Sequence, residues 1–195
     1  MKKMFIFVPI FLICVIALCA LTPAIAMSEN ISENVLRLHI IANSDSDYDQ
    51  SVKLKVRDRI LNVTNDLYRN CDTVNEAVSV TEENIDLLRN EAQKTLSFYG
   101  SECEATAYVT KEYFSTRYYD NFTLPAGIYQ SVKIEIGDAK GKNWWCVMFP
   151  TVCITGCTDD FDKSLSAEEK KMLTERKYIV RFKAVEIYER LKNHN

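Results

Sequence analysis

The chain has 195 residues, with 24 basic and 27 acidic side chains, a formal net charge of −3 and a sequence pI of about 5.5. This length fits one domain with a sizeable hydrophobic core. A weakly acidic chain without a basic stripe argues against a nucleic-acid-binding protein.

The first 26 residues have the order of a secretory signal peptide. Lys2 and Lys3 precede the apolar run 4–21, and Ala24-Ile25-Ala26 provides small residues at a cleavage site. We therefore expect one extracytoplasmic domain over residues 27–195, with 22 basic side chains once Lys2 and Lys3 are subtracted from 24. An uncleaved anchor is the alternative, because an apolar run of about 18 residues just spans a bilayer. Cleavage is favoured, so membrane contact should be transient and confined to the leader.

The first elements predicted after the leader are a strand and a helix. Residues 35–42 alternate, with Leu36, Leu38 and Ile40 on one face and Arg37 and His39 on the other. The polar run 43–47 ends the strand and supplies N-cap candidates for a following helix. One stripe of that helix carries Val52, Val56, Ile60, Val63 and Leu67.

Two further helices and a strand are predicted next. Asp72 or Thr73 caps a brief helix, and Thr81 opens a longer one that runs to Tyr99 and stops at Gly100. Alternation over residues 103–110 then indicates a strand. An aromatic, irregular segment follows over 111–129.

Two strands and two helices complete the chain. Residues 131–136 and 144–149 read as strands, and the Gly-containing connection 137–143 predicts an antiparallel hairpin between them. Ser166 and Glu169 form a capping box for one helix. The last helix carries on one face Val180, Ala184, Ile187 and Leu191.

This order of elements predicts an α+β fold. We expect a small mixed or antiparallel sheet of about four strands, with helices packed mainly on one face. No second domain is required.

Two motifs resemble ligand-binding loops but fail in detail. The segment from Gly137 to Asn143 has one residue too few between its glycines for a phosphate loop and lacks the following Ser or Thr. Asp45, Asp47 and Asp49 begin like a calcium loop, but its Gly and Glu are missing, and helix capping explains them better. We therefore expect neither a cofactor nor a metal site.

Five cysteines follow the leader, and an exported protein permits disulfides. We favour a bridge between Cys146 and Cys153, because Pro150 lies between them and could bend the chain. Buried reduced thiols are nearly as well supported. The remaining cysteines, whose connectivity stays open, are Cys71, Cys103 and Cys157.

Catalytic signatures are sparse. A Cys146–His39 dyad is the only thiol-based pair with a His base on an expected ordered element, and a strand His beside a structural Cys is more common. The sequence has no Gly-x-Ser-x-Gly, His-Glu-x-x-His or Cys-x-x-Cys motif. We therefore do not predict an enzyme.

The apolar segment 143–150 favours a binding role instead. Trp144 and Trp145 must face opposite sides of a strand, so one can enter the core while the other meets a partner. Burial of both is an equal alternative.

Three blocks together resemble the stage II sporulation protein R family of endospore-forming bacteria. They are Asn-Trp-Trp-Cys-Val-Met-Phe-Pro at 143–150, Leu-Pro-Ala-Gly-Ile-Tyr at 124–129, and Leu-Arg-Leu-His-Ile-Ile-Ala-Asn-Ser-Asp-Ser at 36–46. The likeness covers most of residues 27–195 in the same order. Lys142 stands where the family commonly has His, which leaves the role of that side chain open.

The resemblance implies a secreted messenger between forespore and mother cell. Such proteins act in the space between the two membranes, on a membrane-bound aspartic protease that processes the precursor of sigma factor E. The resemblance and the motifs point to a partner-binding surface made of Trp144, Trp145, Phe149, Asn43, Ser44, Asp45 and Asp49. Two alternatives remain, a secreted thiol hydrolase using Cys146 with His39 and a peptidoglycan-binding module with aromatic platforms.

Overall fold

The computed structural model describes residues 11–12, 19, 22–119, 122–150, 165–175 and 178–193. A helix over residues 22–33, here called the N-terminal helix, comes first. It is followed by β1 (Leu36–Ile41), α2 (Asp47–Leu67), α3 (Val74–Glu83), α4 (Ile85–Phe98), β2 (Ala105–Phe114), β3 (Arg117–Tyr118), β4 (Thr123–Leu124), β5 (Gly127–Ile136), β6 (Asn143–Phe149), α6 (Ala167–Thr174) and α7 (Ile179–Asn193). The predicted α+β class is confirmed, with a four-stranded mixed sheet and a separate two-stranded pair, β3–β4.

The four strands lie in the order β2–β5–β1–β6. β1 runs parallel to β5, with Leu36 opposite Gln130, and antiparallel to β6, with His39 opposite Trp145. The predicted hairpin is therefore wrong, since β1 separates β5 from β6 and the connection 137–142 passes its end. β1 therefore pairs along both of its edges, with β5 on one side and β6 on the other.

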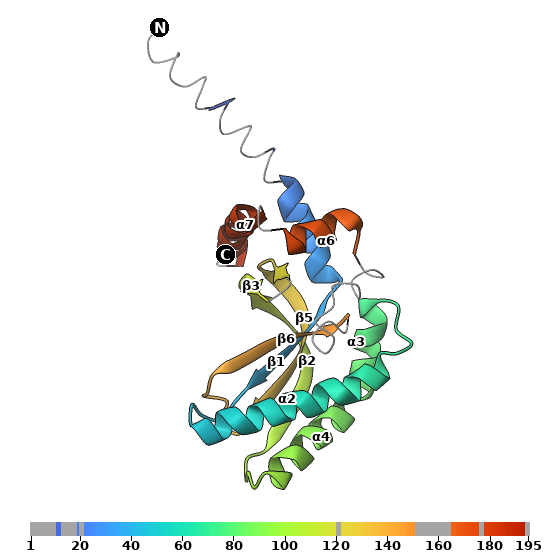
Figure 1. Cartoon of the computed structure of the whole chain (residues 1–195), viewed down its shortest axis with the longest axis vertical. Helices are drawn as coiled ribbons and strands as arrows, with labels where there is room; N and C mark the ends of the chain where they lie inside the picture. Colours follow the sequence, from blue (N-terminus) through green and yellow to red (C-terminus); the bar gives the residue numbers. More distant parts are fainter. Residues whose placement is uncertain are drawn as a thin grey trace.

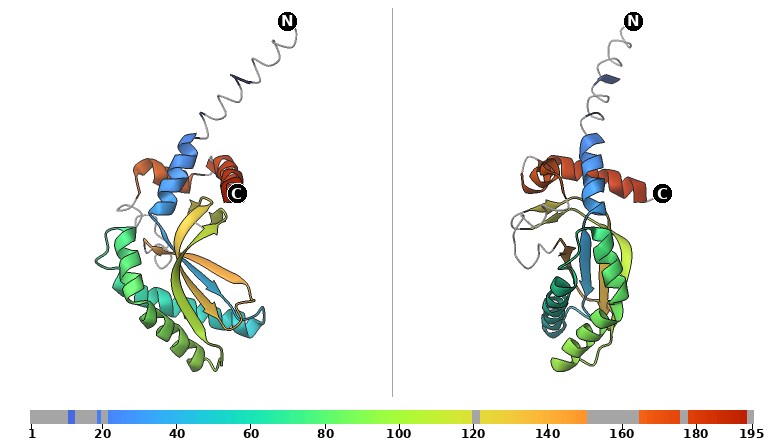
Figure 2. Two further views of the ribbon diagram at one scale, coloured as in Figure 1. Left: turned by 180° about the vertical axis from the view of Figure 1, so that it is seen from behind. Right: turned by 90° about the vertical axis from the view of Figure 1, so that its right-hand side faces the viewer.

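One face of the sheet is covered by α2, α3 and α4 (Figures 1 and 2). Leu38 and Ile40 of β1 are fully buried against this layer. The α2 stripe predicted from sequence supplies part of it, since Val56 and Ile60 are also fully buried. Burying each such side chain contributes about 1.5–3 kcal/mol. Because Leu38 and Ile40 are buried in the core on this face of β1, the residues that alternate with them lie on the opposite face of the sheet.

Four predicted helix boundaries are confirmed. The hydroxyl of Ser46 caps α2 by accepting from the amide of Asp49 at 3.1 Å. Thr73 caps α3, and Ser166 forms the predicted capping box of α6 with Glu169. Gly100 follows the end of α4 with φ of +78°, a conformation that favours glycine.

The predicted start of the long helix at Thr81 is wrong. Thr81 is a fully buried residue within α3, and its hydroxyl donates to the carbonyl of Ala77 at 2.6 Å. Its oxygen also lies 2.6 Å from the hydroxyl oxygen of Tyr68. Thr81 therefore satisfies its hydrogen bonds inside a helix rather than at a cap. The break between α3 and α4 comes at Asn84.

A second core lies at the other end of the sheet, where the N-terminal helix, α6 and α7 gather (Figure 1). Its fully or almost fully buried side chains include Ile31, Leu124, Met172 and Phe182. Polar contacts join the same helices: Asn30 hydrogen-bonds Glu169, and Lys192 pairs with Glu29 at 3.0 Å. The beginning and the end of the described chain therefore pack together.

The N-terminal helix continues across the predicted cleavage site after Ala26. Ala24 is 2% exposed within the second core, and the hydroxyl of Ser28 donates to its carbonyl at 2.8 Å. Within the described ranges, none of the helices combines the length and apolar composition of a membrane span. Most of the predicted leader lies outside those ranges.

The apolar face predicted for the last helix is not the face that packs. Ile187 and Leu191 are 55% and 67% exposed, whereas Phe182 and Val185 are each 1% exposed. Apolar residues occur on more than one side of α7, so periodicity alone did not identify the buried side. The side chain of Val180 lies outside the described set.

Candidate functional site

Strand β6 places its two tryptophans on opposite faces of the sheet, as predicted. Trp144 packs beside the first core, with the guanidinium of Arg57 4.5 Å from its ring centre. Trp145 packs beside the second core on the face that α2, α3 and α4 leave uncovered. Both side chains are half-buried. Trp145 is therefore the tryptophan that faces away from the main helical layer.

Trp145 belongs to a stack of rings and cations on this uncovered face. Its ring stacks on His39 at 5.6 Å between centroids, and the guanidinium carbon of Arg117 lies 3.6 Å from its centre. His39 also contacts Phe114 edge-on. The guanidinium carbon of Arg37 lies 4.2 Å from the centre of the Phe114 ring. Such cation–π contacts gain strength where water is excluded. Trp145 is embedded in this stack, unlike a bare platform for a sugar ring.

A charged network continues from His39 across the sheet. Nδ1 of His39 lies 3.0 Å from both carboxylate oxygens of Glu112, and Nε2 lies 2.9 Å from Oδ1 of Asn143. Burial raises the pKa of Glu112, but the hydrogen bond from His39 and the charges of His39 and Lys133 outweigh it, so the pKa lies below its usual value. Glu112 is thus an ionised partner for His39 and Lys133 at neutral pH.

The predicted polar loop holds two connections of the fold together. The carboxylate of Asp49 accepts from Asn43 at 3.0 Å and from Ser44 at 2.5 Å. Asn43 Oδ1 accepts from the amide of Asp138, and Asp45 accepts from the amide of Lys142 at 2.7 Å. The hydrogen bond from Ser44 holds the pKa of Asp49 below its usual value, against a smaller opposing effect of burial. Asn43, Ser44, Asp45 and Asp49 therefore have structural partners, and their contact with another protein stays a prediction.

Phe149 lies in the first core rather than on the surface. It is 6% exposed and meets Tyr68 edge-on at 6.0 Å between centroids. Because its ring is covered, we leave Phe149 out of the contact surface proposed below.

Cys146 and His39 do not form the dyad considered from sequence. Cys146 lies opposite Leu38 and faces the first core, whereas His39 lies opposite Trp145 on the other face. Cys146 is also disulfide-bonded. A disulfide sulfur carries no thiolate, so the hydrolase mechanism that uses this pair is contradicted. Cys153 lies outside the described residues, and its pairing with Cys146 stays a prediction.

Sequence reasoning missed Arg37 and Arg117 as members of the uncovered face. The alternation of β1 does place Arg37 beside His39 on the polar side, which was a usable signal. Arg117 lies in the irregular segment between β2 and β5, where no periodicity indicates a direction. Tyr119, whose hydroxyl lies 2.7 Å from Nη2 of Arg37, comes from that segment as well.

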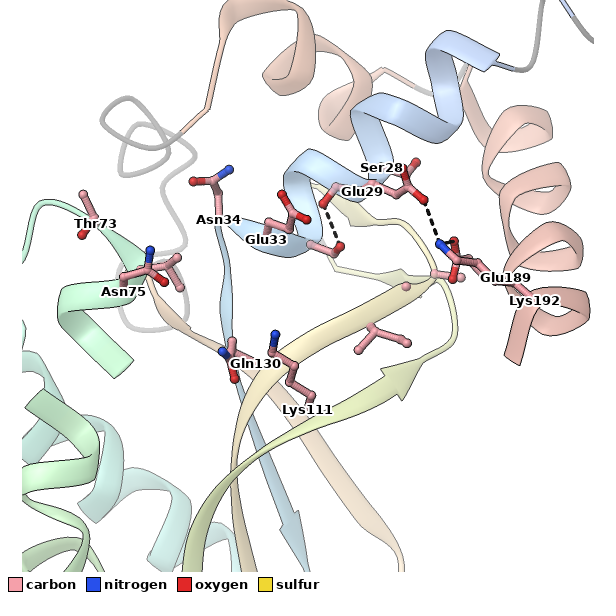
Figure 3. Close-up of a pocket in the computed structure, with 15 residues that line it drawn as sticks. Ser28, Glu29, Glu33, Asn34, Thr73, Asn75, Lys111, Gln130, Glu189 and Lys192 are labelled. Atoms are coloured by element: carbon pink, nitrogen blue, oxygen red, sulfur yellow. Dashed lines mark hydrogen bonds and ion pairs between the residues drawn. The ribbon is translucent and has the colours of Figure 1, made fainter. Parts of the chain in front are cut away.

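A separate cavity of about 580 Å³ lies between the N-terminal helix, the start of α3, strands β2 and β5, and α7 (Figure 3). Lys111 and Gln130 line the cavity from the strands, and Glu33 lines it from the N-terminal helix. Lys192 pairs with Glu29 at one wall. The lining mixes both charges without converging on one centre, so we assign it no chemistry.

Comparison with known proteins identifies one family. The family model described as stage II sporulation protein R matches residues 32–159. Stage II sporulation protein R of Bacillus subtilis (strain 168) is 31% identical over 141 residues, which cover 72% of this chain and 61% of that relative. No solved structure matches the chain significantly. The family match includes the whole four-stranded sheet, whereas α6, α7 and most of the N-terminal helix lie outside it.

Proposed function

Because the chain belongs to the stage II sporulation protein R family, we propose that it is an exported signal of endospore formation. In this proposal it acts between forespore and mother cell and activates the membrane-bound aspartic protease that processes the precursor of sigma factor E. Family membership is the observation that carries the proposal. The signal-peptide pattern of residues 1–26 supports export.

The uncovered sheet face is the proposed contact surface for the protease. It presents the half-buried side chains of Trp145 and Arg117, and aromatic and arginine side chains are favoured anchors at protein interfaces. Docking there shifts the protease toward its active state by binding that state more tightly. Because the polar loop 43–49 is engaged within the fold, its role is to position the sheet edge beside the contact.

Export also constrains when the leader is removed. A cut after Ala26 would divide a helix whose residues Ala24 and Ser28 are each 2% exposed. Cleavage therefore precedes the docking of this helix onto α6 and α7. The exported domain keeps Ile31 as its buried anchor in the second core.

A sporulating strain tests the function directly. A strain without this chain should fail to process the sigma factor precursor, and the wild-type gene should restore processing. Trp145→Ala should restore less processing than Trp144→Ala at equal protein levels, because only Trp145 lies on the proposed surface. Normal processing in the strain without the chain would overturn the function. Equal activity of the two variants would overturn the surface and leave the function standing.

A further inference from the structure

The sheet face opposite α2, α3 and α4 contains two arginines, Arg37 and Arg117. Arg37, in the central strand β1, is fully buried, and Arg117, in β3, is half-buried. Among the residues that the structure describes, neither guanidinium forms an ion pair. Arg37 donates to the carbonyl of Cys146 at 3.2 Å and to the hydroxyl of Tyr119 at 2.7 Å, and both acceptors are neutral. A buried cation normally has a counter-charge, because desolvation is otherwise costly.

Both guanidinium groups also have a nitrogen with no hydrogen-bond acceptor. Nη1 of Arg37 and Nε of Arg117 are buried and have no partner in the described part of the chain, and the same holds for the hydroxyl of Thr116, next in sequence to Arg117. Native proteins leave few buried donors unpaired, because such a donor loses its hydrogen bonds to water without a replacement. Among the residues that the structure describes, no group accepts a hydrogen bond from these donors.

The two cations lie in one neighbourhood. Burial, and then the positive charge of Arg37, holds the pKa of Arg117 below its usual value. Tyr119 does not neutralise them, since burial raises the pKa of its hydroxyl and keeps it protonated. The aromatic rings of Phe114 and Trp145 flank the pair, at 4.2 Å from Arg37 and 3.6 Å from Arg117. An anion beside Arg117 would relieve the repulsion between the two cations.

We propose that Arg117, together with the charge of the buried Arg37, forms a binding site for a carboxylate supplied by an acidic side chain of the partner protein. A carboxylate is planar and offers two oxygens that match guanidinium N–H groups. The aromatic walls suit the methylene groups of an aspartate or glutamate side chain. Carboxylate binding stands on this structure alone, whereas its assignment to the protease rests on the proposed function.

Arg117 is the side chain to change. It lies on a two-residue strand at the rim and is not fully buried, so its removal should spare the core. Arg117→Gln removes the charge. Arg117→Lys keeps the charge but loses the planar guanidinium group that can bind both oxygens of a carboxylate. Arg57→Gln is the matched control, because Arg57 lies 4.5 Å from the ring of Trp144 on the opposite face and pairs with Asp58.

Trp145 reports binding by fluorescence in a Trp144→Phe background. Acetate, titrated at constant ionic strength against chloride, should change Trp145 emission with saturation. Arg117→Gln should weaken acetate binding by about tenfold or more, since a charged hydrogen bond contributes about 1.5–3 kcal/mol. Arg117→Lys should be intermediate, and Arg57→Gln should match the parent. A thermal melt of each variant confirms that it is folded.

Three results would overturn the proposal. The first is a linear acetate response, and the second is an equal response in Arg117→Gln; either shows that the arginines hold no carboxylate. The third is saturation by phosphate at lower concentration than acetate, which would assign a different anion. In sporulating cells, Arg117→Gln should process less precursor than Arg57→Gln. Equal processing there would refute the protease carboxylate, while the strain without the chain tests the function independently.

Discussion

The fold has no room for a side chain at Gly141. A Cβ built there would lie 2.2 Å from the carbonyl oxygen and 2.6 Å from the carbonyl carbon of Ser44. Both are backbone atoms, so one of the two connections must move. The contact is held by hydrogen bonds from the Gly141 amide to Ala42 at 2.9 Å and from the Lys140 amide to Asn43 at 3.1 Å. Gly141→Ala should therefore separate the loop after β1 from the β5–β6 connection.

The expected loss follows from those two bonds. At about 1 kcal/mol each, with partial compensation by water and added strain, Gly141→Ala should lower the free energy of unfolding by about 2–3 kcal/mol. Urea denaturation measures this as a lower midpoint with an unchanged slope. Gly100→Ala is the control: Gly100 has φ of +78° but nothing within 4 Å of an added Cβ, so only backbone strain of about 1–2 kcal/mol applies. A loss no greater than that of Gly100→Ala would refute the description of the two connections.

Two further stability predictions concern buried and ionised polar groups. Thr81→Val should cost about 1–3 kcal/mol in urea denaturation, because it leaves the buried hydroxyl of Tyr68 without its partner at 2.6 Å; a neutral result would show that this pair is dispensable. Asp49 has a pKa below its usual 3.8, so its charge stabilises the fold above that pH, and the contribution disappears as the pH falls through the lower folded value. Asp49→Asn should therefore be less stable than wild type at pH about 6, with the difference shrinking toward pH about 3; a constant difference would contradict this.

Local patterns in the sequence identified the elements that local chemistry decides. Alternation in β1 separated Leu38 from His39, and the structure places them on opposite faces. Ser46, Thr73 and Gly100 marked helix ends through hydrogen bonds or a backbone angle within a few residues. Thr81 misled because the same hydroxyl that caps a helix also bonds back one turn inside it.

Strand order depended on contacts that no local pattern contains. The short connection 137–142 is compatible with a hairpin, yet β1, about 100 residues earlier in sequence, lies between the two strands it joins. Gly137 and Gly141 allow the close approach of the loop after β1: a Cβ on Gly137 would lie 2.3 Å from Oδ1 of Asn43. The glycines that suggested a turn therefore serve a tertiary contact.

The candidate site likewise combines residues that the sequence pattern identified with residues that it did not. His39 and Trp145 were singled out from sequence, and the facing of Arg37 followed from alternation along a strand. Arg117 and Tyr119 reach the uncovered face from an irregular segment, and only the folded chain shows that they enclose Arg37.

Arg37, the second residue of the central strand β1, is fully buried and has no direct contact with water. Replacement of buried charges by apolar residues is often neutral or stabilising, so the position of Arg37 gains the fold little by itself. The arrangement gains a physical rationale when a second molecule brings the negative charge, which connects this buried cation to its proposed use.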